Sequence, residues 1–142
     1  MQIGCLGNAV NLDSYYSVGI TMPKILIVDD DVSITELMKA LVSMEGHQPT
    51  TVNDSPKAIE TANSVNPDLI TLDLMMPGLN GFELCELLHQ DPKFTNTPII
   101  VVSAKDDTES KEKAIKAGAK DYLTKPFGVD NFLQKIKALT GS

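Results

Sequence analysis

From Lys24 onward, short apolar runs alternate with amphipathic segments along the chain. The runs at residues 25–28, 69–72 and 99–102 are almost continuously apolar and rich in β-branched residues. This pattern is typical of parallel strands that helices cover on both faces of the sheet. Weaker runs at residues 50–52 and 122–124 predict two further strands, which we expect at or near the edges of the same sheet.

Helices are predicted between these strands from the spacing of apolar residues. Two segments carry apolar side chains at positions i, i+3, i+4 and i+7, which places them on one face of a helix. These residues are Ile34, Leu37, Met38 and Leu41 in the first segment and Val129, Phe132, Leu133 and Ile136 in the second. A middle helix should begin at Asp54-Ser55-Pro56 and stop before Asn66-Pro67, and Gly46 and Gly118 are placed to close two other helices.

Five successive strand–helix units predict a doubly wound α/β sandwich, because right-handed crossovers place helices on both faces of the sheet. In such folds, ligands bind outside the carboxyl ends of the strands. We expect residues 22–142 to form this domain and residues 1–21 to be a flexible leader. No output domain is expected to follow, since the last helix ends close to the end of the sequence.

The charge of the chain is acidic: 12 Lys+Arg stand against 19 Asp+Glu, for a formal net charge of −7. Binding to nucleic acid or to an anionic membrane needs clustered positive charge. We therefore expect neither nucleic acid nor a membrane as a partner. Two cysteines, no signal peptide and no membrane-spanning segment indicate a cytoplasmic protein. His47 and His89 have no second metal ligand at a suitable spacing and are expected at the surface.

Polar side chains stand at four of the five predicted strand ends. Asp29-Asp30-Asp31 follows the first strand, Asp73 the third, Ser103 the fourth and Lys125-Pro126 the fifth. Any one of them is explained by helix capping or by a solvated loop. Three carboxylates at one edge repel each other, however, by about 3 kcal/mol per pair at ~5 Å and an effective dielectric near 20. The pattern therefore favours a compensating divalent cation such as Mg2+, with Lys125 as a second positive charge.

Four motifs at these strand ends resemble the receiver domain of two-component response regulators. They are Val28-Asp29-Asp30-Asp31, Leu72-Asp73-Leu74-Met75-Met76-Pro77-Gly78-Leu79-Asn80-Gly81, Val102-Ser103-Ala104-Lys105 and Tyr122-Leu123-Thr124-Lys125-Pro126-Phe127. The resemblance covers about residues 23–139 and is closest in type to the stand-alone chemotaxis regulators. It implies a flavodoxin-like fold, with a five-stranded parallel sheet in the order 2-1-3-4-5 and five helices on its two faces.

The resemblance also implies a role for each residue of the acidic edge. Asp73 matches the phosphoacceptor, which takes a phosphoryl group from a histidine of a partner and becomes an aspartyl phosphate. Asp30 matches the direct Mg2+ ligand and Asp29 its water-linked neighbour. Asp73 itself and the backbone carbonyl of Met75 complete the expected protein ligands.

Further residues would contact or respond to the phosphoryl group. Ser103 and Lys125 match residues that hold its oxygens, and Ala104 matches the small residue beside it. The Lys125-Pro126 bond matches a bond that is typically cis in the family. Ser103 and Tyr122 match the two switch residues, which remodel the outer face of the last two helices and the last strand.

The function that follows from the resemblance is that of a single-domain response regulator. Its phosphodonor would be a sensor histidine kinase or a histidine phosphotransfer protein, and its output an unknown downstream protein. The chain would be a monomer or a phosphorylation-dependent dimer. It would assist its own phosphorylation and dephosphorylation without being a turnover enzyme.

Three alternatives stand beside this prediction. A Mg2+-dependent phosphatase of the haloacid dehalogenase type also uses an aspartate nucleophile, but its motif is Asp-x-Asp, and Met75 occupies the second acidic position here. A flavodoxin-like cofactor carrier needs a Ser/Thr/Gly-rich loop where this chain has Asp29-Asp30-Asp31. A receiver fold that serves only as a docking protein, without phosphorylation, is the third.

Overall fold

The computed structural model describes residues 22–141, so the predicted leader lies outside the described residues. A five-stranded parallel sheet forms the centre of the fold, with strand order β2-β1-β3-β4-β5. The strands are β1 (Lys24–Val28), β2 (Gln48–Val52), β3 (Leu69–Leu72), β4 (Ile99–Ser103) and β5 (Asp121–Thr124). The two weaker runs are indeed the edge strands, β2 and β5, and the order 2-1-3-4-5 is confirmed.

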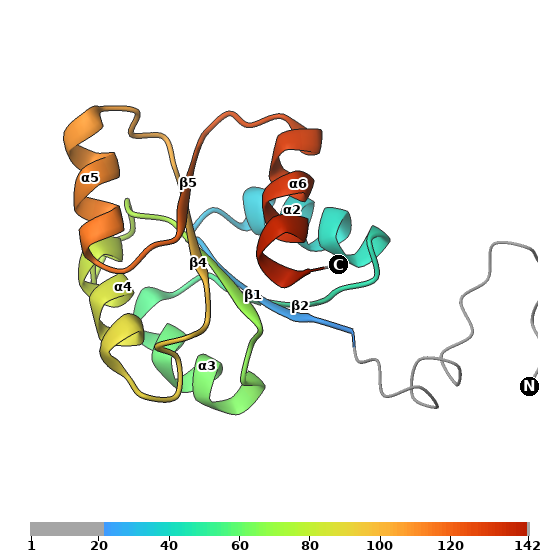
Figure 1. Cartoon of the computed structure of the whole chain (residues 1–142), viewed down its shortest axis with the longest axis horizontal. Helices are drawn as coiled ribbons and strands as arrows, with labels where there is room; N and C mark the ends of the chain where they lie inside the picture. Colours follow the sequence, from blue (N-terminus) through green and yellow to red (C-terminus); the bar gives the residue numbers. More distant parts are fainter. Residues whose placement is uncertain (1–21, 142) are drawn as a thin grey trace, which may run out of the picture.

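The helices lie on both faces of this sheet, as the doubly wound arrangement requires (Figure 1). They are α2 (Val32–Met44), α3 (Ala58–Val65), α4 (Gly81–Gln90), α5 (Thr108–Lys116) and α6 (Val129–Thr140), and a short 3-10 helix, η2 (Ser55–Lys57), precedes α3. Helices α2 and α6 cover one face, and α3, α4 and α5 cover the other (Figure 1). The flavodoxin-like fold with five helices is thus confirmed for the described residues.

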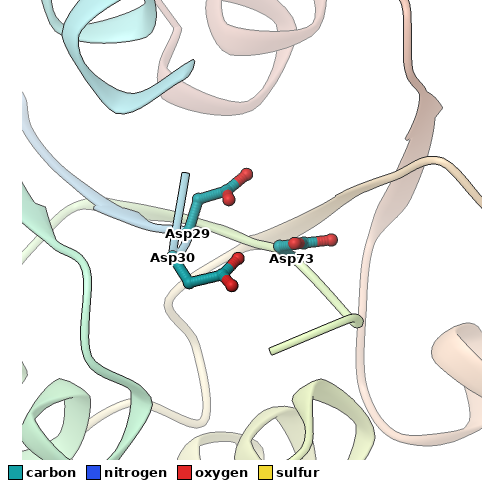
Figure 2. Close-up of side chains that lie close together, drawn as sticks. All are labelled: Asp29, Asp30 and Asp73. Atoms are coloured by element: carbon teal, nitrogen blue, oxygen red, sulfur yellow. The ribbon is translucent and has the colours of Figure 1, made fainter. Parts of the chain in front are cut away.

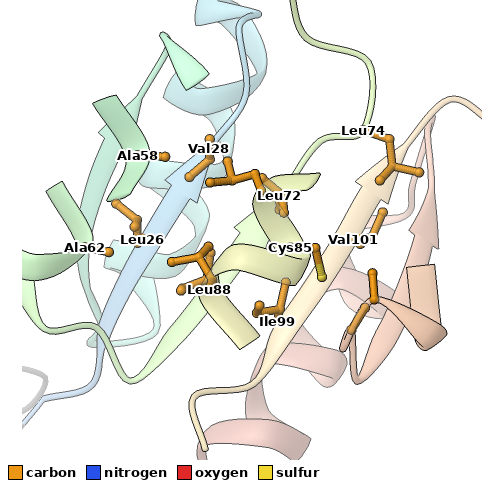
Figure 3. Packing of buried hydrophobic residues seen from close by; sticks show 14 of the residues in the cluster. Leu26, Val28, Ala58, Ala62, Leu72, Leu74, Cys85, Leu88, Ile99 and Val101 are labelled. Carbon is orange, nitrogen blue, oxygen red and sulfur yellow. The ribbon is translucent and has the colours of Figure 1, made fainter. Parts of the chain in front are cut away.

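Two separate apolar clusters hold the layers together, one on each face of the sheet. On the side of α3, α4 and α5, alternate residues of the central strands meet small and branched side chains of the helices (Figure 3). Ala58 and Ala62 of α3 and Cys85 and Leu88 of α4 belong to this cluster. On the other face, Phe132 of α6 is completely buried among strand residues. Burial of this apolar surface is the main stabilising contribution to the fold.

The buried face of α2 differs from the predicted stripe. Met38 and Val42 are buried against the sheet, whereas the side chain of Leu37 is 46% exposed. The contact line of α2 runs through positions 35, 38 and 42, and Leu37 lies to one side of it. Val129, which was also placed on a buried stripe, is 45% exposed because it is the first residue of α6.

Left-handed backbone follows α2 and α5 at the two glycines where the sequence predicts it, and α3 ends before Asn66 as expected. Asn66 follows α3 with φ 54°, and Gly46 and Gly118 follow α2 and α5 with φ 87° and 117°.

None of the helices in the described part of the chain is both long and apolar enough to cross a lipid bilayer.

Candidate functional site

Three carboxylates converge at the carboxyl edge of the sheet (Figure 2). Asp29 and Asp30 follow β1, and Asp73 follows the neighbouring strand β3. One ligand oxygen from each residue lies within 4.8 Å of the others. Asp29 and Asp73 are buried, at 2% and 5% exposure, while Asp30 is exposed. The sequence placed all three at this edge, and the structure brings them together.

Asp29 is held at both of its carboxylate oxygens. The backbone N–H of Asp31 donates to Oδ1 at 2.9 Å, and the ammonium of Lys125 lies 2.6 Å from Oδ2. Its own backbone N–H donates to the carbonyl of Val52 on β2, at 3.0 Å. A buried charge with these partners is rigid and compensated, as burial of a carboxylate demands.

Asp73 has fewer partners for its charge. The N–H of Met75 donates to its Oδ1 at 3.3 Å, and Lys125 Nζ lies 3.6 Å from its Oδ2. Burial, and then the neighbouring charge of Asp29, raise the pKa of Asp73 above its ordinary value, which Lys125 only partly offsets. The site is therefore short of positive charge next to Asp73.

Lys125 directly follows the carboxyl end of β5, and its side chain extends to the acidic cluster. Its side chain is 17% exposed, and its backbone N–H donates to the carbonyl of Ser103 on β4 at 2.8 Å. The peptide bond between Lys125 and Pro126 is cis, the isomer expected from the resemblance. The long Lys125 side chain pairs with Asp29, which follows β1, and with Asp73, which follows β3.

The remaining predicted residues line the β4–β5 side of this edge. Ser103 is completely buried at the end of β4, and its hydroxyl accepts a hydrogen bond from the N–H of Lys105 at 3.3 Å. Ala104 follows it and is exposed. The Tyr122 hydroxyl donates to the carbonyl of Lys105 at 2.7 Å and also interacts with the Ser103 hydroxyl. Ser103 and Tyr122 are thus linked to each other and to the β4–α5 loop.

The donors present fit a hard divalent cation. Three carboxylates and one lysine carry a formal charge of −2, and oxygen is the ligand atom that Mg2+ prefers. Asp29, Asp30 and Asp73 would hold the ion. The Met75 carbonyl stays a predicted ligand, and the Met75 side chain is 56% exposed, so it is free of packing demands.

Three residues with contacts to this site went unrecognised in the sequence. Asn53 and Ser55 follow β2, and their side chains bond to the two acidic loops. Gly81 begins α4 where a Cβ would overlap the backbone of Asp73 and Leu74. The signal for Asn53 and Ser55 is the strand-end rule itself, because β2 also delivers polar residues to the carboxyl edge of the sheet.

His47 is buried, contrary to the surface position expected for it. Only 7% of its side chain is exposed, and its Nδ1 atom is enclosed without a hydrogen-bond partner in the described part of the chain. It lies between α2 and β2, beside α6. Burial lowers the pKa of His47, against a smaller effect of the Glu45 carboxylate.

Comparison with curated proteins finds transcription regulators among the relatives. The DNA-binding dual master transcriptional regulator RpaA of Synechocystis is 38% identical over 83% of this chain and 49% of its own length. The DNA-binding response regulator MtrA of Mycobacterium tuberculosis is 35% identical over 81% of this chain and 49% of its own length. This chain spans about half the length of the curated relatives it matches.

These relatives correct the expected list of partners. The acidic charge predicts that nucleic acid is not a partner, and relatives named as DNA-binding regulators contradict that prediction. The physical reason is that the net charge of −7 describes only the 142 residues over which it is counted. A match to half of a longer protein says nothing of the other half's surface.

Solved structures of response regulators share the fold of this chain. A response regulator of Chloroflexus aurantiacus superimposes with TM-score 0.81 at 28% identity, covering 86% of this chain and 100% of that one. The receiver domain of the Francisella response regulator 1452 has TM-score 0.77 and 38% identity, covering 84% and 97%. Chemotaxis protein CheY4 of Vibrio cholerae has TM-score 0.80 and 28% identity, covering 84% and 99%.

The family model of the response regulator receiver domain matches residues 25–137, which include every strand end described above. The match agrees with the fold and with the acidic cluster at its carboxyl edge. The chain therefore belongs to the response regulator receiver domain family, whose members are phosphoacceptors in signalling.

Proposed function

We propose that this protein receives a phosphoryl group on Asp73 from a phosphohistidine of a sensor histidine kinase or a histidine phosphotransfer protein. The observation that carries this proposal is the acidic cluster, in which the buried Asp73 lies close to the carboxylates of Asp29 and Asp30 and 3.6 Å from the Lys125 ammonium. Asp73 is buried, and Lys125 only partly offsets the burial and the Asp29 charge that raise its pKa. That makes its oxygen the natural attacking atom.

In the proposed reaction, a carboxylate oxygen of Asp73 forms a bond to phosphorus as the phosphorus–nitrogen bond of the donor breaks. The imidazole of the donor leaves with the electron pair of that bond. Asp29, Asp30 and Asp73 would hold Mg2+, which supplies positive charge to the phosphoryl oxygens when it is bound. Phosphoryl transfer of this kind depends mostly on positioning and on nearby cations.

Lys125 is placed to follow the charge. Its ammonium already lies within 4 Å of both Asp29 and Asp73, so a small shift brings it to a phosphoryl oxygen on Asp73. Ser103 would contribute its hydroxyl from the adjacent strand β4, and Ala104 leaves space beside the incoming group. These roles rest on the match of each residue to the motif and on its position at the edge.

The output would leave through the face formed by α5, β5 and α6. Phosphate on Asp73 adds charge and acceptor oxygens that attract Ser103, and the Tyr122 side chain linked to it then changes position. The β4–α5 loop, to which Tyr122 is bonded, moves with them. A partner that binds this face would detect the change.

The identity of that partner is a separate part of the proposal. A stand-alone regulator of the chemotaxis type acts on another protein, whereas the DNA-binding relatives suggest a receiver that controls a transcription regulator. Both use protein contact at the switching face. We further propose residues 22–142 as the domain, a cytoplasmic location, and a monomer or a phosphorylation-dependent dimer.

The phosphatase alternative has no observation in its favour. Its second catalytic carboxylate would stand at position 75, where the structure has an exposed methionine. We therefore propose a phosphoacceptor that assists its own phosphorylation and dephosphorylation, without turnover of an external substrate.

Binding of beryllofluoride, a stable mimic of the phosphoryl group, tests the proposal. With Mg2+ and beryllofluoride, the amide resonances of Ser103, Lys105 and Tyr122 should shift in wild type, because these residues surround the proposed switch. The Asp73→Asn variant should show no such shifts. Equal shifts in both proteins, or none in wild type, would contradict the proposed function.

A further inference from the structure

The loop after β2 contacts both of the loops that carry the acidic residues. It begins at Asn53 and leads through Asp54 to Ser55, the first residue of η2. Strand β2 is the edge strand beside β1, so this loop emerges at the carboxyl edge of the sheet, next to Asp29 and Asp30. Two of its side chains bond to the neighbouring loops.

Asn53 ties the end of β1 to the first turn of α2. Its side-chain amide donates to the backbone carbonyl of Asp29 at 2.8 Å and to Thr35 Oγ1 at 3.0 Å. Thr35 is completely buried, and its own hydroxyl donates to the carbonyl of Val32 at 3.0 Å. Asn53 therefore supplies the partner for two groups that fold the chain from β1 into α2.

Asp30 depends on this arrangement more than its neighbours do. Its carboxylate accepts no hydrogen bond from the residues that the structure describes. Its position is set by the backbone on either side: Asp29 before it, and Asp31, which caps α2, after it. A shift of the Asp29 carbonyl is passed directly to the Asp30 side chain.

Ser55 fixes the loop on the other side of the cluster. It is 2% exposed, and its hydroxyl donates to the backbone carbonyl of Pro77 at 3.1 Å. Pro77 lies four residues after Asp73, in the loop between β3 and α4. A Cβ at Gly78 would be in ordinary contact with Ser55 Oγ at 3.5 Å, which shows how closely the two loops pack.

We infer that Asn53 and Ser55 are positioning residues for the acidic site, holding the Asp29–Asp30 loop and the Asp73–Met75 loop at the separation that a cation requires. This inference rests on the proposed function. Neither residue touches the reacting atoms. Each acts on backbone that carries a ligand, as outer-shell partners of metal ligands commonly do.

The test is the affinity of the metal-free full chain for Mg2+, measured by titration calorimetry. Asn53→Ala should weaken the affinity about tenfold, the lower range for outer-shell partners. Ser55→Ala should weaken the affinity less, because the β3–α4 loop that Ser55 contacts is also held by the buried side chain of Met76. Asn63→Ala is the matched control, because it removes an exposed asparagine from α3 and should leave the affinity unchanged.

Two readouts separate positioning from loss of structure. Asn53→Ala should raise the Mg2+ concentration for half-maximal phosphorylation by a small donor and leave the rate at saturating Mg2+ near that of wild type. Thr35→Val removes one of the two Asn53 hydrogen bonds, the one to Thr35 Oγ1, with little change in side-chain size. It should weaken Mg2+ binding on its own and add nothing in the double variant with Asn53→Ala.

The outcomes distinguish this inference from the proposed function. If wild type binds Mg2+ and Asn53→Ala and Thr35→Val bind it equally well, the positioning role is wrong and the proposed function stands. Should wild type fail to bind Mg2+ at all, both fail together. Weaker binding in Asn53→Ala and Thr35→Val, with Asn63→Ala unchanged, supports the inference.

Discussion

At the scale of single residues, the carboxyl edge of the sheet gathers more negative charge than its partners compensate. Asp29 has the ammonium of Lys125 at 2.6 Å and a backbone N–H at 2.9 Å, whereas the same two kinds of partner lie farther from Asp73, at 3.6 Å and 3.3 Å. Burial and the charge of Asp29 raise the pKa of Asp73, so the fold disfavours its ionised form. A site arranged in this way is less stable when it is empty of cations.

Replacing Asp73 by Asn tests this imbalance. In metal-free buffer at neutral pH, Asp73→Asn should raise the free energy of unfolding by about 1 kcal/mol, because it removes a buried charge from a repulsive cluster. Asp54→Asn, which neutralises an exposed carboxylate after β2, should have little effect. Thermal denaturation measures both. In excess Mg2+ the gain should shrink, since wild type then binds the ion more tightly. A less stable Asp73→Asn variant without Mg2+ would contradict the electrostatic argument.

Which residues the sequence could place depended on how their contacts arise. Asp29, Asp73 and Ser103 follow strongly apolar runs, so the strand-end rule locates them directly. Asn53 follows a weaker run, and its bond to the carbonyl of Asp29, which follows the neighbouring strand, is a side-chain contact that the strand-end rule does not specify. The burial of His47 likewise comes from tertiary packing, because no local pattern distinguishes it from an exposed histidine.

At the scale of secondary structure elements, strands were easier to predict than helix faces. The three central strands are apolar on both sides, so their pattern leaves no choice of orientation. Helix α2 offers apolar side chains around more than half of its surface, and the sheet selects Met38 and Val42 while leaving Leu37 exposed. Periodicity therefore found the helix and misjudged one member of its buried face.

The end of α5 is packed closely enough to test by substitution. Gly118 has φ 117°, and a Cβ there would overlap the ring of His89 on α4. Gly118→Ala should therefore lower the free energy of unfolding by about 2–3 kcal/mol. Gly46→Ala separates the causes, because φ is also positive at 87° but no atom lies within 4 Å, so only about 1 kcal/mol should be lost.

The double variant His89→Ala/Gly118→Ala completes this comparison. Removing the ring should recover part of the loss relative to Gly118→Ala alone, since the overlap is then relieved and only the backbone cost stays. Chemical denaturation of wild type, the two glycine variants and the double variant gives the free energies of unfolding. Equal losses in Gly46→Ala and Gly118→Ala would show that the contact between α4 and α5 is looser than described.

At the scale of the whole molecule, the hydrophobic pattern predicted the fold class correctly, whereas the net charge gave a wrong prediction about partners. Alternating strands and helices predicted a doubly wound sandwich, but the order 2-1-3-4-5 came from the family resemblance, because periodicity does not determine strand order. The net charge of −7 led to a wrong exclusion of nucleic acid, since DNA-binding regulators are among the relatives and this chain covers about half of their length. The composition of these residues therefore does not by itself exclude a class of partner.

The central claim is that this fold makes one aspartate, Asp73, a phosphoacceptor. The most direct measurement is the intact mass of the protein after incubation with a small-molecule phosphodonor such as an acyl phosphate, with and without Mg2+. We predict the mass of one added phosphoryl group on wild type in the presence of Mg2+, far less without it, and none on Asp73→Asn. Equal labelling of wild type and Asp73→Asn, or no labelling of wild type with Mg2+ present, would contradict the account.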